Sequence, residues 1–139
     1  MNKAEWMVAL QFIALAPFVI PWPTAIEINS GSMVLLLGII LGFFTLFYNR
    51  PGNFNVRPKY KENSKLITDG PYRFSRHPIY LSLLISCTGL LIMQSSLWKW
   101  GFLIPLFWVL NIKAAMEENI MKQHFPDYEN YLKNSRRWI

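Results

Sequence analysis

The sequence has little charge and almost no cysteine. Only 16% of its 139 residues are charged, whereas 53% are hydrophobic. A soluble domain usually carries about 25% charged residues, so this composition favours a membrane protein. The single cysteine, Cys87, lies within an apolar run, and one cysteine excludes a disulfide within the chain.

The motifs of several common enzyme classes are also missing. There is no GxGxxG fingerprint of a dinucleotide site and no GxxxxGK[ST] phosphate loop. Cysteine and histidine do not occur at metal-binding spacings, so we expect no metal site. No Ser-His-Asp or Cys-His arrangement stands out. The net charge of +6 has no nucleic-acid-binding motif beside it, so we expect no nucleic acid as a partner.

Four apolar runs dominate what is present. With their aromatic flanks, they approach the roughly 20 residues of a transmembrane helix. They predict an all-α fold, an integral-membrane bundle of about four transmembrane helices in a single domain, with a cytoplasmic cofactor site and a short C-terminal helix. The expected spans are about 5–22, 32–48, 78–95 and 97–115 within the domain 1–139.

Lysine and arginine are distributed unevenly between these runs. The loop 49–77 and the tail 116–139 are rich in them, the first connector has none, and the connector between the third and fourth runs has only Lys99. The positive-inside rule therefore places the loop, the tail and both termini in the cytoplasm. The compact chain favours a prokaryotic inner membrane. A loop this long is more typical of a functional segment than of a simple connector.

Small residues predict close helix packing. Gly38 and Gly42 form a GxxxG pattern in the second run, and Ser82, Ser86 and Gly89 form a stripe in the third. Both patterns are typical of helices in close contact. Packing within one bundle and a dimer interface through Gly38 and Gly42 are both consistent with them.

The segment SRHPIY stands at the start of the third run. Pro78 predicts the first helical turn, with His77 at or near the cap. Free N–H groups at a helix start attract a carboxylate or phosphate, and Arg73 and Arg76 would add to this field. Tyr80 shares a helix face with His77. The segment is thus either an anion site with an aromatic wall or an interfacial anchor for lipid headgroups.

Paired carboxylates, Glu117 and Glu118, directly follow the fourth run. Two adjacent carboxylates suit an anionic inner leaflet poorly. They could bind the ammonium or ribose hydroxyls of a ligand, or they could pair with the arginines of the loop 49–77. The tail then predicts a short helix, with Asp127 as its N-cap.

GPYRFSRHPIY, followed one span later by EE, resembles the integral-membrane methyltransferases of the isoprenylcysteine carboxyl methyltransferase and phospholipid methyltransferase group. The resemblance covers roughly 57–139 and implies S-adenosylmethionine binding at the cytoplasmic face. The tail matches at Tyr131 and Arg137, which are expected to close the pocket or to meet the acceptor and are the candidate catalytic residues. The resemblance implies these cofactor-binding residues: Tyr72, Arg73, Arg76, His77, Pro78, Tyr80, Glu117 and Glu118.

The implied function is methyl transfer to a lipophilic acceptor that enters from the lipid bilayer, as in isoprenylcysteine carboxyl O-methyltransferases. The residues offer no convincing general base, which favours a carboxylate or thiolate acceptor over a protonated amine. The alternatives are a phospholipid N-methyltransferase-like enzyme, a membrane reductase of the sterol-reductase type and a non-enzymatic four-span protein. A non-enzymatic four-span protein, such as a transporter, would have polar residues along a path through the bilayer. The runs offer Gln11, Thr45, Thr88 and Asn111.

Overall fold

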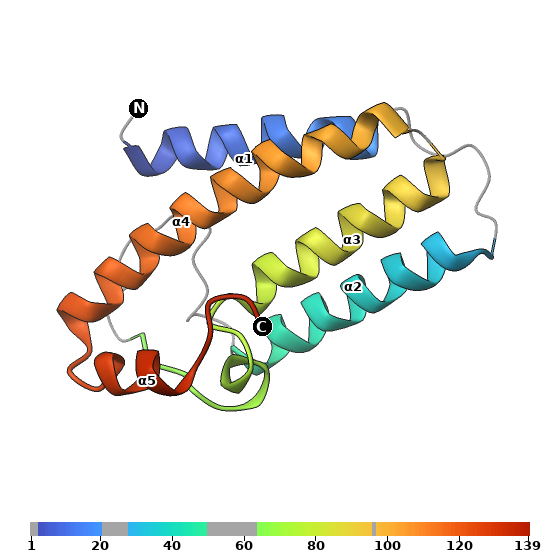
Figure 1. Cartoon of the computed structure of the whole chain (residues 1–139). Helices are drawn as coiled ribbons and strands as arrows, with labels where there is room; N and C mark the ends of the chain where they lie inside the picture. Colours follow the sequence, from blue (N-terminus) through green and yellow to red (C-terminus); the bar gives the residue numbers. More distant parts are fainter. Residues whose placement is uncertain (1–2, 21–27, 50–63, 96) are drawn as a thin grey trace.

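The computed structural model of the chain describes residues 3–20, 28–49, 64–95 and 97–139 (Figure 1). Across these ranges the regular structure is helical, as predicted, apart from one isolated bridge between Ser75 and Arg136. The elements in chain order are α1 (Lys3–Val19), α2 (Ser30–Tyr48), the 3₁₀ turn η1 (Gly70–Arg73), α3 (Pro78–Gln94), the 3₁₀ turn η2 (Leu97–Phe102), α4 (Leu103–His124) and α5 (Tyr128–Asn134).

Local sequence signals set several of the helix ends. Asn29 and Ser32 form a capping box at the start of α2, in which each side chain accepts a hydrogen bond from the backbone N–H of the other, at 3.1 and 3.0 Å. Pro78 opens α3 with His77 at the N-cap, as predicted. Asp127 also stands at the predicted N-cap of α5, but its side chain makes no capping hydrogen bond.

The fourth apolar helix differs from the predicted span 97–115. Residues Leu97–Phe102 form η2, and α4 begins only at Leu103 and continues to His124. Pro105 therefore falls in the first turn of α4, where its missing N–H is tolerated. No glycine or proline follows within the helix until it ends, so the helix continues through Glu117 and Glu118. These carboxylates lie on α4 itself and not in a separate tail.

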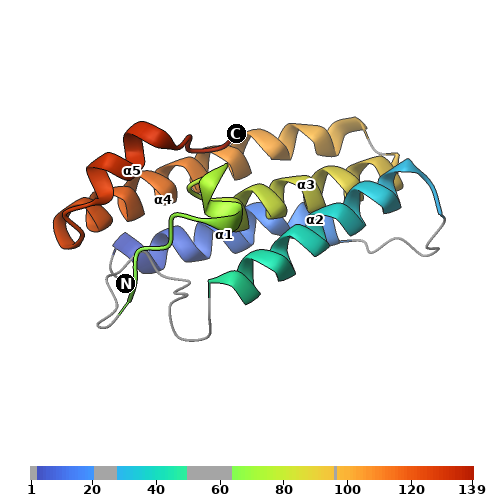
Figure 2. The same cartoon turned by 90° about the horizontal axis from the view of Figure 1, so that it is seen from below.

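The four long helices run roughly alongside one another (Figures 1 and 2). α1 lies beside α4, and α2 lies beside α3, with α5 and the C-terminus near the end where α3 begins. Residues from three helices, Phe18, Leu91, Leu106 and Leu110, are completely buried in the shared core.

The small residues of α2 and α3 pack against each other within the chain. A Cβ atom added at Gly38 would lie 2.6 Å from the backbone nitrogen of Ser86, and one at Gly89 would lie 2.4 Å from the backbone nitrogen of Leu35. Such distances leave no room for a side chain. The GxxxG pattern therefore serves this helix pair, and the dimer stays a prediction.

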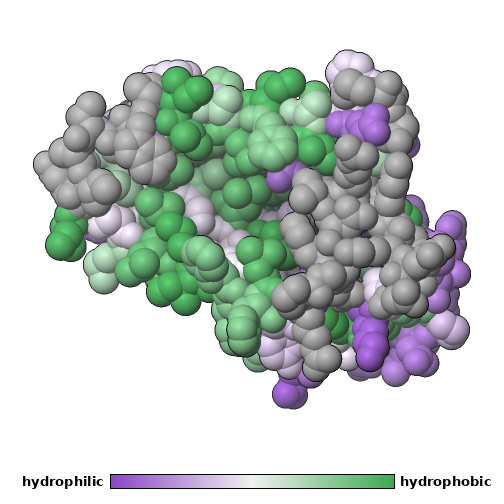
Figure 3. All heavy atoms as spheres, turned by 180° about the vertical axis from the view of Figure 1, so that it is seen from behind, coloured by the Kyte–Doolittle hydropathy of each residue, from purple (hydrophilic) through white to green (hydrophobic). Residues whose placement is uncertain are grey.

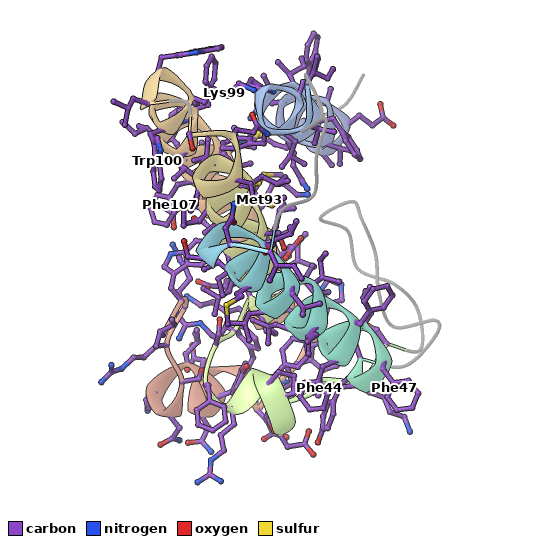
Figure 4. All side chains as sticks on the ribbon, turned by 90° about the vertical axis from the view of Figure 1, so that its right-hand side faces the viewer. Phe44, Phe47, Met93, Lys99, Trp100 and Phe107 are labelled. Carbon is purple, nitrogen blue, oxygen red and sulfur yellow. The ribbon has the colours of Figure 1, made fainter. Side chains whose placement is uncertain are left out.

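The outer face of α2 is apolar and exposed. Phe43 and Phe47 are 71% and 86% exposed, and Figure 4 shows Phe47 projecting away from the bundle. Among the described helices, α2 alone has both the length and the apolar composition to cross a membrane, and α3 is apolar but shorter. Hydrophilic residues gather at the end where α5 lies, at the lower right of Figure 3.

Candidate functional site

The turn that leads into α3 is fixed against the end of α2. Gly70, the first residue of η1, has a φ of +57°, a left-handed conformation that glycine adopts without strain. A Cβ atom there would lie 2.5 Å from a carbon of the Tyr48 ring, so the ring packs directly on the glycine. The Tyr48 hydroxyl donates a hydrogen bond of 2.8 Å to Asp69. The turn therefore enters the site at a defined position relative to α2.

His77 and Tyr80, at the start of α3, both contact the paired glutamates of α4. Their rings are stacked, with centroids 5.5 Å apart and an interplanar angle of 5°. The two ring nitrogens of His77 reach different carboxylates. Nδ1 lies 3.5 Å from Oε2 of Glu117, and Nε2 lies 3.3 Å from Oε1 of Glu118. Two motifs that are far apart in the sequence are thus in direct contact.

Glu118 is the centre of a buried charge network. Its side chain is only 7% exposed. Arg76 donates from Nε to Oε1 at 3.0 Å, and Arg137 donates from Nε to Oε1 at 3.0 Å and from Nη2 to Oε2 at 2.6 Å. The sequence left two roles open for this carboxylate, ligand binding and pairing with arginine. The structure shows that it pairs with two arginines, Arg76 from the loop and Arg137 from the tail.

Glu117 has different surroundings although it is the next residue. The Tyr80 hydroxyl donates to its Oε1 at 2.5 Å, and no arginine within the described ranges pairs with it. Its side chain is 22% exposed, against 7% for Glu118. Glu117 is therefore the carboxylate of the pair that retains capacity to accept hydrogen bonds from a ligand.

This network controls the protonation of His77 and Glu118. Burial alone would lower the pKa of His77, but hydrogen bonds to Glu117 and Glu118 outweigh burial, and the pKa is raised above its ordinary 6.5. Burial alone would raise the pKa of Glu118, but hydrogen bonds from His77, Arg137 and Arg76 bring it well below its ordinary 4.5. Glu118 is thus ionised at neutral pH, and His77 keeps its proton to a higher pH than a free imidazole.

The C-terminal residues complete the site by pairing with the loop before α3. The backbone N–H of Arg76 donates to the carbonyl of Arg136 at 2.9 Å, and its Nη1 donates to the carbonyl of Ser135 at 2.6 Å. The Ser75 hydroxyl donates to the carbonyl of Arg137 at 3.1 Å. Arg137 therefore reaches Glu118 from a backbone that is itself attached to the loop.

α5 contacts the same loop through Tyr131. Its hydroxyl donates a hydrogen bond of 2.6 Å to the carbonyl of Tyr72, and the ring of Tyr128 lies edge-on to its own ring at 5.7 Å. Burial raises the pKa of Tyr131 to about 12, so the hydroxyl keeps the proton that it donates. Tyr131 thereby holds one end of η1 while Tyr48 holds the other.

Most of the predicted site residues lie together, although their roles toward a cofactor or an acceptor stay predictions. Pro78 starts α3, and Tyr72 and Tyr131 bond to each other beside the network. Arg73 is exposed and, within the part of the chain that the structure describes, forms no ion pair. Hydrogen bonds or ion pairs connect Arg76, His77, Tyr80, Glu117, Glu118 and Arg137.

Lys113 is a neighbour of the site that the sequence analysis did not single out. Its side chain is 1% exposed, and its Nζ donates to Gln11 of α1 and lies 5.3 Å from the centroid of the Tyr80 ring. Lys113 precedes Glu117 by one helical turn. This spacing places both on one helix face, so the sequence contained a signal for it.

Two other residues join the site through the folded tail. Asn111, which the sequence offered only as a polar residue within the bilayer, accepts a hydrogen bond of 3.0 Å from Arg137. The ring centroid of Trp138 lies 6.5 Å from that of His77 and 5.2 Å from that of Phe107. No local pattern indicates these contacts, because they depend on the tail turning back along α4.

Comparisons with known proteins identify the family of the chain. A family model described as phospholipid methyltransferase matches residues 26–128. A probable protein-S-isoprenylcysteine O-methyltransferase of Oryza sativa subsp. indica is 31% identical over 104 residues, which are 73% of this chain and 54% of the rice protein. The range matched by the family model contains the turn before α3 and the paired glutamates, but the match assigns no role to an individual residue.

Two bacterial relatives match a shorter segment. The nickel-cobalt-cadmium resistance protein NccN of Alcaligenes xylosoxydans xylosoxydans is 26% identical over 77 residues, 54% of this chain and 36% of that protein. The cobalt-zinc-cadmium resistance protein CzcN of Cupriavidus metallidurans is 31% identical over 77 residues, 54% of this chain and 35% of that protein. The chain thus spans between about a third and a half of the length of these relatives. No solved structure matches.

Proposed function

The chain belongs to the phospholipid methyltransferase family, and from this premise we propose that it transfers a methyl group from S-adenosylmethionine to a lipophilic acceptor in the membrane. The observation that supports the proposal most directly is the contact between the turn before α3 and the paired glutamates. Tyr80 and His77 bind Glu117, whereas arginines occupy Glu118. The site therefore has one carboxylate that two arginines neutralise and one that pairs with no arginine in the described ranges.

The residues around Glu117 fit the groups of S-adenosylmethionine. This donor carries a carboxylate, an ammonium, ribose hydroxyls and an adenine ring. The start of α3 has no side-chain cap, so its first-turn N–H groups remain for a carboxylate. Glu117 is suited to the ammonium or the hydroxyls, and the half-buried Tyr72 offers a ring beside the same turn. The donor set of the chain thus matches the cofactor in charge.

Glu118 takes a different role in this proposal. Its oxygens already accept hydrogen bonds from Arg76 and Arg137 and lie near His77. It is a positioning residue that fixes the loop, α4 and the tail relative to one another. Of the two glutamates, only Glu117 is assigned to direct ligand binding.

The chain's own groups favour an acceptor that is already nucleophilic. The bound donor would supply an electrophilic methyl group on a sulfonium, and the protein needs to orient the reactants and exclude water. His77 lies between two carboxylates, and its raised pKa favours the protonated form, so it is a poor general base. A carboxylate acceptor needs no base, whereas a protonated amine does. We therefore propose carboxyl O-methylation of an isoprenylcysteine-like acceptor.

Four membrane spans, formed by α1, α2, α3 and the part of α4 up to about residue 115, are part of the same proposal. The exposed apolar face of α2 and the membrane association of the family support it, as does the distribution of lysine and arginine along the chain. In this orientation η1, α5 and both termini face the cytoplasm, in a prokaryotic inner membrane. A cytosolic donor and a lipid-borne acceptor would then meet at the polar end of the bundle.

Phospholipid N-methylation is the second candidate, because the matching family is described as phospholipid methyltransferase. The two candidates differ in the acceptor group. The detergent-purified chain, supplied with labelled S-adenosylmethionine, should methylate a prenylated cysteine with a free carboxylate and leave phosphatidylethanolamine unlabelled. Labelling of phosphatidylethanolamine alone would reverse this preference.

Donor binding is the first experiment, measured by calorimetry on the full chain in detergent. The wild type should bind S-adenosylmethionine, and Glu117→Gln should weaken binding about tenfold or more, the equivalent of one lost charge-assisted hydrogen bond. Glu129→Gln, an exposed carboxylate in the first turn of α5, is the matched control and should bind like the wild type. A folded wild type that does not bind the donor would overturn the proposal.

A further inference from the structure

The arginines beside the site occur in two pairs, and each pair is divided in the same way. Arg73 and Arg76 belong to the loop, and Arg136 and Arg137 belong to the tail. Arg76 and Arg137 both bind Glu118. Arg73 and Arg136 are exposed, and neither forms an ion pair within the ranges that the structure describes. Each segment thus has one arginine for the interior and one for the outside.

The two segments that carry the exposed arginines are held next to each other. Ser75 and Arg136 form the isolated parallel bridge, in which the N–H of Arg76 donates to the carbonyl of Arg136 at 2.9 Å. The Ser75 hydroxyl adds a bond of 3.1 Å to the carbonyl of Arg137. The exposed side chains are therefore presented from a backbone that is fixed and not from two independent loops.

Each of these segments also exposes a large apolar side chain. Phe74 is 72% exposed and directly follows Arg73, and Ile139 is 75% exposed at the end of the tail segment. Phe74 belongs to the loop segment and Ile139 to the tail segment, and the bridge between Ser75 and Arg136 joins these two segments. An exposed aromatic ring beside an exposed arginine suits a surface where apolar and anionic groups meet, because the ring leaves water while the guanidinium binds an anion.

We propose that Arg73, Phe74, Arg136 and Ile139 form a docking surface for the anionic phospholipid headgroups of the cytoplasmic leaflet. The guanidinium groups bind headgroup phosphates, and the two apolar side chains enter the boundary between headgroups and acyl chains. The charge of the surface selects anionic over zwitterionic lipid. Since the inward arginines of the same segments bind Glu118, the surface links the leaflet to the position of the site. The proposal requires a membrane protein but does not depend on methyl transfer.

The test compares thermal unfolding of the full chain in two kinds of vesicle, one of phosphatidylcholine and one in which part of it is replaced by phosphatidylglycerol. The wild type should unfold at a higher temperature in the anionic vesicles, and added salt should reduce the difference. Arg73→Gln with Arg136→Gln should lose most of this increment. Phe74→Ala should lose part of it without any change of charge.

Lys122→Gln with Lys133→Gln is the matched control, because it removes the same charge from exposed positions outside the paired segments. This variant should keep the increment. If both double variants lose the increment equally, the effect comes from net charge and the proposal is overturned. A wild type that does not respond to lipid charge would also overturn it. Inorganic phosphate added to phosphatidylcholine vesicles should not reproduce the increment. If the arginine variant does not fold, the Phe74→Ala variant and the salt dependence of the wild type still decide.

Discussion

The bundle contains a buried polar network toward each end, and the two are built differently. At the α5 end, Glu118 is bound by Arg76, His77 and Arg137. At the opposite end, Lys99 of η2 is 3% exposed and donates to the backbone carbonyl of Ile20 at 3.2 Å and to the side chain of Gln94. Figure 4 places Lys99 at the end of the bundle near α1.

The difference lies in what each network leaves available. Lys99 and Gln94 bind carbonyl groups at the end of α1, Gln94 reaching that of Phe18 at 2.6 Å. A cation and an amide at a helix C-terminus satisfy carbonyls that would otherwise be unpaired. The Glu118 network instead has ionised groups on several sides and places beside itself a second carboxylate, Glu117, that arginine does not neutralise. This remaining capacity distinguishes a candidate ligand site from a connection between helices.

Glu118→Ala should produce the largest loss of stability. Removing the carboxylate leaves two arginines and His77 without their common partner, and breaking a buried ion pair from one side typically costs about 3–5 kcal/mol. The free energy of unfolding in detergent would fall by that amount, and donor binding would fall with it. Glu129→Ala, an exposed residue of α5, should stay within about 0.5 kcal/mol of the wild type. Similar values for the two variants would show that the network does not hold the site together.

Lys99→Met should have a smaller effect, confined to the other end. It leaves the Ile20 carbonyl and the Gln94 side chain without their donor, and each lost, partly buried hydrogen bond typically costs about 1 kcal/mol. Donor affinity should not change, because the variant lies at the far end from Glu117. Lys122→Met, at an exposed position of α4, serves as the control for loss of a lysine. A Lys99→Met protein that folds normally but loses donor binding would contradict the separation of the two ends.

Near neutral pH, the change of stability with pH should be smaller than the effects of the two substitutions above. It should come from His77 and Glu118, at the α5 end of the bundle. The pKa of His77 is raised, so its contribution is complete below its ordinary 6.5 and is lost as pH rises through its folded-state pKa. The pKa of Glu118 is lowered, so its contribution is complete above its ordinary 4.5 and is lost as pH falls through its folded-state pKa. Unfolding measured from pH 5 to pH 9 should show a decline in the free energy of unfolding on the alkaline side. His77→Gln should remove that decline, and Lys99→Met should leave it unchanged.

Much of this arrangement could be predicted from local sequence. The apolar runs gave the long helices, Pro78 gave the start of α3, and the resemblance grouped His77 and Tyr80 with the glutamates. The predicted fourth span ends near residue 115, where the apolar pattern stops, whereas α4 itself continues to His124. Polar residues continue a helix as well as apolar ones when no glycine or proline intervenes.

The division of labour between neighbouring residues could not be predicted. Glu117 and Glu118 are identical in type and adjacent, and their surroundings differ only because consecutive residues of α4 point to different sides. The same holds for Arg136 and Arg137, of which only the second reaches Glu118. These assignments depend on where the tail folds back, and that path follows from contacts between segments far apart in the chain.

The pairing of two arginines with one carboxylate has a consequence for how these positions can change. Loss of Arg76 leaves Arg137 to hold Glu118, so a second loss would cost a different amount from the first, and the effects of single substitutions would not add. If the charge at one of these three positions is reversed, a single reversal at another position cannot restore both ion pairs. Among related sequences, positions 76, 118 and 137 should therefore vary together as a group of three, and covariation measured in pairs would understate their coupling.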